Sequence, residues 1–284
     1  MRYVNASTGL VAAHAMLLLG ALGAAGPAAA QERERERERT PEEWLRRCRE
    51  WGDDRDRVRH CEVRDVTIPR VSGRLAVDGR QNGGIAVRGW DRNEILVRAK
   101  IQTWAESDAE ARRLAAGIRV RTDDGRISAE ESASGRRSGW SVSYDVYVPR
   151  QSDLDLTTHN GGISVEGVQG RIAVEALNGG VSIRNVRGEL RGGTTNGGVM
   201  LALDGDRWIG DGVDLETTNG GVTIVVPERY NARLETGTVN GGMHVEFPVT
   251  VQGMVGRRLT TTLGSGGPLI RVRTTNGGVT LRRR

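Results

Sequence analysis

From Val63 onward, apolar and polar residues alternate in short stretches that are separated by glycine, asparagine and aspartate. A period of two places successive side chains on opposite faces of a strand, whereas an amphipathic helix needs a period near 3.6. The alternation therefore predicts an all-β protein whose short strands are joined by tight turns. Outside the repeats described next, the clearest strands are predicted at 75–77, 85–87, 95–97, 118–120 and 140–148.

The motif Asn-Gly-Gly recurs through this region and divides most of it into repeated units. It begins at Asn82, Asn160, Asn178, Asn196, Asn219, Asn240 and Asn276. From Asn160 onward, successive copies begin 18, 18, 23, 21 and 36 residues apart. The last interval is long enough for two units, so we expect a further unit around 264–267, with Ser265 in the position of the asparagine.

Each unit carries apolar residues at the same distances from its asparagine. Three residues after it stand Ile163, Val181, Val199, Val222, Met243 and Val279, and five residues after it stand Val165, Ile183, Leu201, Ile224, Val245 and Leu281. Gly170 and Gly188 mark a second turn in the first two of these units. Each unit is therefore predicted to hold two turns and two short strands.

Two architectures use such units. In a meander of hairpins, Asn-Gly would form type I′ turns between antiparallel neighbours. In a β-solenoid (β-helix-like), each unit of 18–23 residues is one coil, and like residues stack directly above like. Recurrence of the same residues in register favours the solenoid, because a meander requires only alternation. At about 4.8 Å per coil, six or seven coils would extend about 30 Å.

The seven asparagines are interpreted as repeat corners. Asparagine tolerates the left-handed backbone conformation and glycine takes a positive φ at little cost, so both suit a tight turn. The alternative is that the stacked row of Asn and Thr side chains contacts sugars.

Two helices are predicted among the strands. Thr40-Pro41-Glu42-Glu43 is a capping box that begins a short helix ending near Gly52. Cys48 on this helix and Cys61 are the two cysteines of the chain, and we expect them to form a disulfide worth about 3 kcal/mol. The helix region 41–62 would then cap the open end of a solenoid domain at 63–284. A second capping box at 107–110 predicts an inserted helix that stops at Gly117.

The first forty residues are predicted to be an export signal and a spacer. Residues 1–30 have a basic start, an apolar core and the small-residue pattern Ala28-Ala29-Ala30, so cleavage after Ala30 is expected. Residues 31–40 begin with strictly alternating charges and contain nothing to bury, as in a charged low-complexity spacer. No later segment is a long apolar run, so we expect an exported protein with no membrane span after signal cleavage.

Charge and motifs exclude several function classes. The formal net charge is +5, but the arginines are interleaved with acidic residues, so nucleic-acid binding is not expected. No nucleophile elbow, zinc helix or phosphate-binding loop is present, and neither His159 nor His244 stands beside an evident nucleophile. His60 alone does not supply the ligands of a metal site beside the two cysteines. Asp204, Asp206, Asp211 and Asp214 do not match a calcium loop. No catalytic, cofactor-binding or metal-binding residue is therefore predicted.

The enzymatic alternative is a polysaccharide-degrading β-helix enzyme, either a lyase or a hydrolase. Such enzymes need paired carboxylates, or a basic residue with acidic calcium ligands, in one groove. Asp155, Glu166, Glu175 and Glu189 lie in the repeats, yet their positions within the units do not form an obvious pair.

The repeats also carry a family resemblance. The stretch NGGISVEGVQGRIAVEALNGGVSIRNV, the recurring TTNGGV and the earlier GWDRNEILVRAKI resemble the DUF4097 family, a group of exported bacterial domains labelled as adhesins. The resemblance covers residues 63–284. It implies an exported protein with a β-solenoid-like fold and brings no catalytic residues.

These patterns together predict a non-catalytic, exported, adhesin-like β-solenoid that acts as a binding or scaffold surface at the cell envelope, in the periplasm or at the cell surface. The expected partners are an envelope polysaccharide, a surface protein or further copies of this chain. Self-association is expected because the last coil would end near Leu281 with an uncovered strand edge, where Arg282, Arg283 and Arg284 would discourage stacking or bind an acidic polymer.

Overall fold

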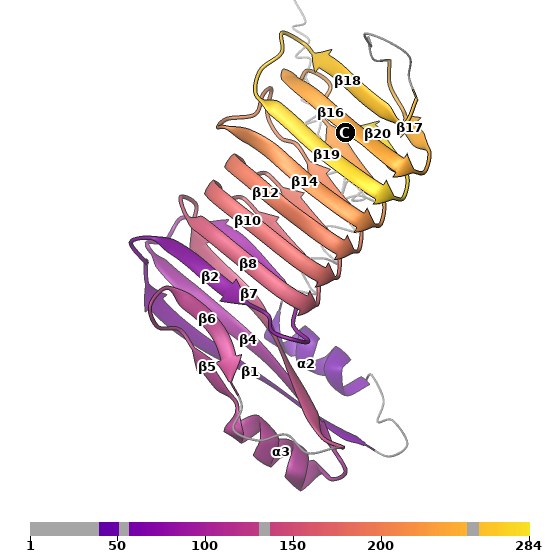
Figure 1. Ribbon diagram of the computed structural model, residues 1–284. Coiled ribbons are helices and arrows are strands. Elements are labelled where there is room, and N and C mark those ends of the chain that lie inside the picture. Colours follow the sequence, from indigo (N-terminus) through magenta and orange to yellow (C-terminus); the bar gives the residue numbers. More distant parts are fainter. Residues whose placement is uncertain (1–39, 51–56, 131–136, 249–255) are drawn as a thin grey trace, which may run out of the picture. The chain divides into compact units, whose positions relative to one another are not determined.

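The computed structural model describes residues 40–50, 57–130, 137–248 and 256–284 (Figure 1). The predicted signal peptide, nearly all of the charged spacer, and Trp51 and Gly52 lie outside these residues. By its internal contacts the chain divides into a unit at 1–44 and a unit at 45–284, and the architecture below is that of the second unit. Its described residues are mostly β and form two large sheets that do not close into a barrel.

The helices are α2 (Pro41–Glu50) and α3 (Asp108–Gly117). The strands are β1 (Val58–Pro69), β2 (Arg74–Asp78), β3 (Ile85–Trp90), β4 (Glu94–Ala105), β5 (Arg119–Arg121), β6 (Arg126–Glu130), β7 (Gly139–Pro149), β8 (Asp153–Asn160), β9 (Ile163–Glu166), β10 (Gln169–Asn178), β11 (Val181–Arg184), β12 (Arg187–Asn196), β13 (Val199–Ala202), β14 (Gly212–Asn219), β15 (Val222–Val226), β16 (Ala232–Asn240), β17 (Met243–Val245), β18 (Arg258–Leu263), β19 (Leu269–Asn276) and β20 (Val279–Arg283).

Each sheet contains ten of the described strands. The first sheet has the order β1-β4-β7-β3-β9-β11-β13-β15-β20-β17, and the second has the order β18-β16-β19-β14-β12-β10-β8-β2-β6-β5. The chain passes from the second sheet to the first at each Asn-Gly-Gly corner. We call a strand of the second sheet, its corner and the next strand of the first sheet an NGG repeat; the repeats are β2–β3, β8–β9, β10–β11, β12–β13, β14–β15, β16–β17 and β19–β20.

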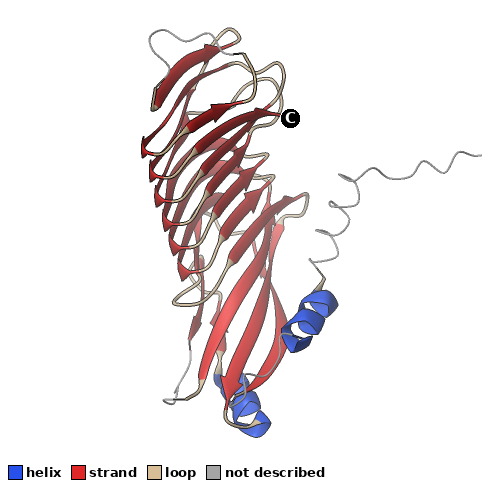
Figure 2. Ribbon diagram, turned by 90° about the vertical axis from the view of Figure 1, so that its right-hand side faces the viewer, coloured by secondary structure: helices blue, strands red, loops and turns tan. Residues whose placement is uncertain are grey.

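Neighbouring NGG repeats pair through parallel strands in register. Asn178 is opposite Asn160 on one side and Asn196 on the other, and Val181 is likewise flanked by Ile163 and Val199. In Figure 2 these strands lie one above another on each sheet. Parallel pairing between consecutive units excludes a hairpin meander, in which neighbours would be antiparallel.

The core lies between the two sheets. The apolar residues three and five positions after each corner asparagine are buried in the first sheet, except at the edge strand β17, where Met243 and Val245 are half-buried. They face inward-pointing residues of the second sheet such as Leu156, Val174 and Leu215. Each such side chain contributes about 1.5–3 kcal/mol of burial free energy, so the stacked rows supply most of the stabilisation of the repeats.

The prediction that the chain ends at an uncovered coil is wrong. The final repeat, β19–β20, lies between β14–β15 and β16–β17, so a repeat that comes last in sequence is flanked on both sides. Leu281 is fully buried. Figure 1 shows β19, in yellow, between β14 and β16.

The expected extra unit at Ser265 is also absent. Strand β18 pairs antiparallel with β16, and residues 264–268 link it to β19. The Ser265 backbone N–H and hydroxyl both donate to Asn231 Oδ1, at 2.8 and 3.0 Å. In the described part of the long interval before Asn276, a return strand and its link therefore stand where a second NGG unit was expected.

The glycines of the corners have a different role from the one predicted. Neither the corner asparagines nor most of these glycines have a positive φ. Instead, the backbones of neighbouring corners approach so closely that a Cβ on the first glycine would overlap a carbonyl oxygen: Gly161 against Gly83, Gly179 against Gly161, and Gly197 against Gly179. Close stacking, and not a left-handed turn, requires glycine here.

Outside the repeats, the N-terminal strands pair antiparallel, so the predicted solenoid domain does not consist of repeats throughout. β4 lies between β1 and β7. Helix α3 begins at the N-cap Ser107, whose hydroxyl accepts from the Glu110 N–H at 3.3 Å, and ends at Gly117 as the capping box predicts. A disulfide joins Cys48 of α2 to Cys61 of β1.

Candidate functional site

The outward face of the second sheet carries polar residues in rows that run across the strands. One row passes in register through Thr157, Glu175, Gly193, Glu216, Arg273, Gly237 and Arg258. A second row, one residue before each corner asparagine, includes Thr195, Thr218 and Thr275. Both rows exist because parallel, in-register pairing places equal positions of successive repeats side by side.

Three adjoining depressions follow these rows. One of about 490 Å³ extends from Asp78 to Thr195, one of about 360 Å³ surrounds Gly193, and one of about 420 Å³ surrounds Gly237. The first two share Glu175, Ala176 and Thr195, and the last two share Glu216. We call these three depressions together the groove. Gly193 and Gly237 line it at two places where they interrupt a row of side chains.

The middle of the groove and its end at β18 differ in charge. Around Gly193, the exposed carboxylates of Glu175 and Glu216 have no hydrogen bond or ion pair with any residue that the structure describes. Around Gly237, Arg258 likewise has no hydrogen bond or ion pair with a described residue. The guanidinium group of Arg273 makes one long contact, 3.9 Å from the Asp214 carboxylate. The groove therefore presents unpaired carboxylates near its middle and guanidinium groups near β18.

Glu235 also lines the depression around Gly237, but its charge is compensated. Arg271 donates to Glu235 at 3.0 Å and to Asp214 at 3.3 Å. The hydrogen bond to Glu235 raises the pKa of the Arg271 guanidinium, so this residue keeps its charge and holds β19 to both neighbouring strands.

Of the acidic residues considered for catalysis, Asp155 and Glu175 line the depression around Gly193, whereas Glu166 and Glu189 do not. Asp155 lies 3.7 Å from Arg74, Glu189 lies 2.5 Å from Arg191, and Glu166 is on β9 in the other sheet. Glu216 lines the same depression, and it lies two strands and about 10 Å from Glu175 along the sheet. Sequence reasoning missed Glu216, although both residues stand three positions before a corner asparagine.

This carboxylate pair lies on an open surface. General acids for glycosidic cleavage need a desolvated carboxyl beside a second, ionised one. Glu175 and Glu216 are both exposed, so neither is in such an environment.

The histidines and aspartates noted in the sequence are dispersed. His159 lines the first depression, His60 is 3.4 Å from Glu62, and His244 is on the edge strand β17. Asp206 pairs with Arg207, and Asp204 with Arg284. Across the described ranges, no three His, Cys, Asp or Glu residues are placed to hold a metal ion.

The corner asparagines form a continuous ladder. Each side-chain amide donates to the amide oxygen of the next corner, at 2.8–3.0 Å, in the order Asn240, Asn276, Asn219, Asn196, Asn178, Asn160 and Asn82. Two residues before the corners, the hydroxyls of Thr158, Thr194, Thr217 and Thr274 donate to the carbonyl oxygen of the first glycine of a neighbouring corner. The ladder uses one donor and one acceptor of each interior asparagine, so it binds the repeats to one another.

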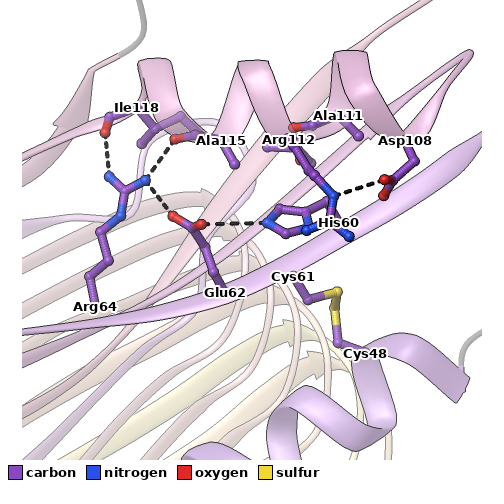
Figure 3. Close-up of polar contacts among 11 residues, drawn as sticks. Cys48, His60, Cys61, Glu62, Arg64, Asp108, Ala111, Arg112, Ala115 and Ile118 are labelled. Carbon is purple, nitrogen blue, oxygen red and sulfur yellow. Dashed lines mark hydrogen bonds and ion pairs between the residues drawn. A yellow bond between two sulfur atoms is a disulfide. The ribbon is translucent and has the colours of Figure 1, made fainter.

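A second polar cluster surrounds the start of β1 (Figure 3). His60 contacts Glu62, Glu62 pairs with Arg64, and Arg64 donates to the carbonyl oxygens of Ala115 and Ile118 at 2.8 and 2.6 Å. These carbonyls are at the C-terminal end of α3, where a cation is favourable. The cluster fastens α3 to β1 and contains no nucleophile among its described members.

Comparison with known proteins identifies the family. The family model described as Toastrack DUF4097 matches residues 59–282. The chain belongs to the Toastrack family. Its strands β1 to β20 therefore fall almost entirely within one family domain, as the resemblance of the repeats predicts.

Solved structures similar to this Toastrack chain share little sequence with it. A "putative cell adhesion protein" from Clostridium sporogenes ATCC 15579 is 11% identical, has a TM-score of 0.44, and the match covers 80% of this chain and 100% of that one. A "putative adhesin" from Bacteroides fragilis NCTC 9343 is 12% identical with a TM-score of 0.32, covering 79% and 97%. A "putative lipid binding protein" from Parabacteroides distasonis ATCC 8503 is 8% identical with a TM-score of 0.30, covering 79% and 96%.

Comparison with curated proteins finds no match. Among the described residues, no helix is both long enough and apolar enough to cross a membrane.

Proposed function

We propose that this protein is an exported, non-catalytic, adhesin-like β-solenoid of NGG coils whose groove binds an envelope polysaccharide. The observation that carries the proposal is the series of three adjoining depressions across the strands of one face. They are lined by residues of strands from β2 to β18, which are eight neighbouring strands of the second sheet. At about 4.8 Å per strand the groove is about 34 Å long, which suits an extended polymer.

The groove offers the groups that a polysaccharide needs. Glu175 and Glu216 accept hydrogen bonds from sugar hydroxyls, and a bond to an ionised acceptor is stronger than a neutral one. Thr195, Thr218 and Thr275 add hydroxyl groups, and Arg258 and Arg273 attract carboxylate or phosphate substituents. Since no Phe, Tyr or Trp side chain lines the three depressions, binding rests mainly on polar contacts and weakens with salt.

Export is part of the proposal. Residues 1–30 have the pattern of a cleaved signal peptide, and a disulfide between Cys48 and Cys61 is stable in an oxidising compartment. The protein would then act in the periplasm or at the cell surface. The corner asparagines would set the spacing of the groove residues by keeping the coils in register.

The test is a retention assay with washed envelopes and isolated envelope polysaccharides, in which both sedimented protein and newly released sugar ends are measured. We expect retention that salt weakens, with no release of sugar ends. Thr218→Trp fills the groove and should reduce retention at least tenfold.

The matched control is Thr223→Trp, which adds the same bulk to the outward face of the other sheet within the same repeat. Equal retention by the two variants, or no retention by the unmodified protein, contradicts the proposal. Release of sugar ends that Glu216→Gln abolishes would instead establish the polysaccharide-degrading alternative.

A further inference from the structure

The final NGG repeat fills a gap between two repeats that precede it in the chain. We call the space between β14–β15 and β16–β17 the slot, and β19–β20 occupies it. We propose that the final repeat of a second copy of this chain can fill the slot, so that two copies exchange their final repeats and form a dimer. The proposal concerns self-association and is independent of the ligand in the groove.

The slot holds the final repeat through the strand pairing and asparagine ladder that other NGG repeats also use, and through one arginine of its own. β19 makes parallel pairs with β14 and β16, and β20 with β15 and β17. The Asn276 amide donates to Asn219 and accepts from Asn240, each at 2.8 Å. Arg271 adds its bonds to Asp214 and Glu235, one on either side of the slot.

None of these contacts depends on the covalent link to the rest of the chain. An identical repeat from a second copy would make the same hydrogen bonds, ion pairs and apolar contacts. Insertion of the final repeat into the slot of its own chain is therefore favoured over exchange only by the covalent link. The link gives the final repeat an effective concentration near the millimolar range at that slot. Shortening or lengthening the link should therefore shift the balance between insertion within one chain and exchange between two chains.

The link is the five-residue segment 264–268, Gly-Ser-Gly-Gly-Pro, and it crosses the beginning of β16. Strands β18 and β19 lie on opposite sides of β16, about 10 Å apart. Ser265 binds Asn231 just before β16, and the Pro268 carbonyl accepts from the Arg233 N–H at 3.2 Å. Deleting residues 265–267 leaves three Cα–Cα steps that reach at most about 11 Å when straight, which is too short to pass around β16.

Exchange has a consequence for the proposed function. A dimer would carry two grooves and hold a polymer at two places, which strengthens retention without any new contact in either groove.

The experiment uses two full-length variants, one with Thr218→Cys and the other with Thr275→Cys. These exposed residues stand side by side on β14 and β19 in the register of Thr217 with Thr274. A disulfide between the two variants in excess of that formed by the control pair below requires the final repeat of one copy to lie in the slot of the other. The mixture is unfolded, refolded at increasing protein concentration, and separated by size and on non-reducing gels.

With the shortened link, we expect most of the folded protein to be a dimer and the mixed variants to cross-link. With the link lengthened by Gly-Ser-Gly-Gly, we expect monomers and at least a tenfold lower cross-linked fraction. Thr195→Cys mixed with Thr275→Cys is the matched control, because β14 separates those strands and no cross-link should form.

A shortened-link protein that is folded and monomeric overturns the proposal, as does a dimer that does not cross-link. If the shortened chain does not fold, the cross-linking of the protein with its natural link is the test. A cross-linked fraction that rises with protein concentration supports exchange, and its absence at the highest concentration overturns it.

Discussion

The middle of the repeat region and its two ends are built from the same units but differ in how those units are ordered. From β8–β9 to β14–β15, repeats that follow one another in sequence are neighbours in space. At the C-terminal end, β19–β20 precedes β16–β17 in the stack. At the N-terminal end, β2–β3 lies between β8–β9 and the later strands β6 and β7.

The shape of a unit and its place in the stack therefore have separate causes. The ladder, the glycine contacts and the register are the same in the middle and at the reordered C-terminal end, so they depend on the local motif. The order depends on longer segments that leave the repeats, such as β4 with α3 at one end and β18 at the other. A fixed motif therefore permits several stacking orders, and the connections choose one.

The largest effect is expected from the corner glycines, in both regions alike. A Cβ at Gly220 would overlap the Gly197 carbonyl oxygen, and one at Gly277 would overlap that of Gly220. Because backbone must move to relieve the overlap, Gly220→Ala and Gly277→Ala should each cost about 3 kcal/mol of unfolding free energy, measured by urea denaturation.

The adjacent glycines are the matched controls. A Cβ at Gly221 or Gly278 would stand 3.5 or 3.6 Å from the nearest carbonyl oxygen, which is an ordinary contact. Alanine there should cost less than about 1 kcal/mol. Equal costs at the first and second glycines would refute close stacking as the reason for the motif.

The next largest effect is expected from the asparagine ladder, where replacing an interior asparagine should cost more stability than replacing the one at the end. Asn196 donates to Asn178 and accepts from Asn219, whereas Asn240 donates to Asn276 and accepts from no described residue. Asn196→Ala should therefore cost about 1.5 kcal/mol and Asn240→Ala about half as much, in thermal or urea unfolding. A larger cost at Asn240 would contradict the order in which the ladder runs.

Two threonines that stand two residues before a corner asparagine should differ in how replacement by valine changes the free energy of unfolding. Thr217 donates to the Gly197 carbonyl oxygen at 2.7 Å, but the buried hydroxyl of Thr238 has no hydrogen-bond partner among the described residues. Thr217→Val should lower the unfolding free energy by about 1 kcal/mol, while Thr238→Val should leave it unchanged or raise it. Equal losses would show that Thr238 has a partner comparable to that of Thr217.

The smallest expected effect is the pH dependence of stability at Asp153, which lies where the repeats stack in the order of the sequence. The Arg171 backbone N–H donates to Asp153 at 2.8 Å and its guanidinium group adds two bonds, so the pKa of Asp153 is lowered. A lowered folded pKa gives stability that is present above the unfolded value, near 3.9, and is lost as pH falls through the folded value. Asp153→Asn should cost up to about 1 kcal/mol at pH 7 and progressively less below about pH 4, in unfolding measured across that range. A cost that does not change with pH would show that charge is unimportant there.

The sequence predicted the unit better than the assembly. The apolar positions after each asparagine, the helix at Ser107 and the pairing of Cys48 with Cys61 all depend on local pattern or on the scarcity of alternatives. The reason for the glycines was missed because backbone proximity between corners is not visible in one chain segment. The place of β19–β20 was missed because TTNGGV occurs identically in residues 217–222 and 274–279, so nothing in the motif indicates which neighbours it takes.

The groove residues also divide into those that the repeat unit predicts and those that depend on how the strands assemble. Glu175 and Glu216 have the same position within their repeats, and that equality was available from the sequence. Arg258 belongs to β18, outside any repeat, and it enters the groove only because β18 returns antiparallel beside β16. Its contribution could not be found by aligning the units.

Two engineered cysteine pairs test within one chain whether the final repeat lies between β14–β15 and β16–β17. Thr218→Cys with Thr275→Cys places thiols on neighbouring strands, and Thr218→Cys with Val239→Cys places them on strands that β19 separates. In dilute refolded protein, we expect an intrachain disulfide in the first variant and none in the second, detected by mass spectrometry of non-reduced peptides. The opposite result would mean that the repeats stack in the order of the sequence and that the final repeat does not lie between β14–β15 and β16–β17.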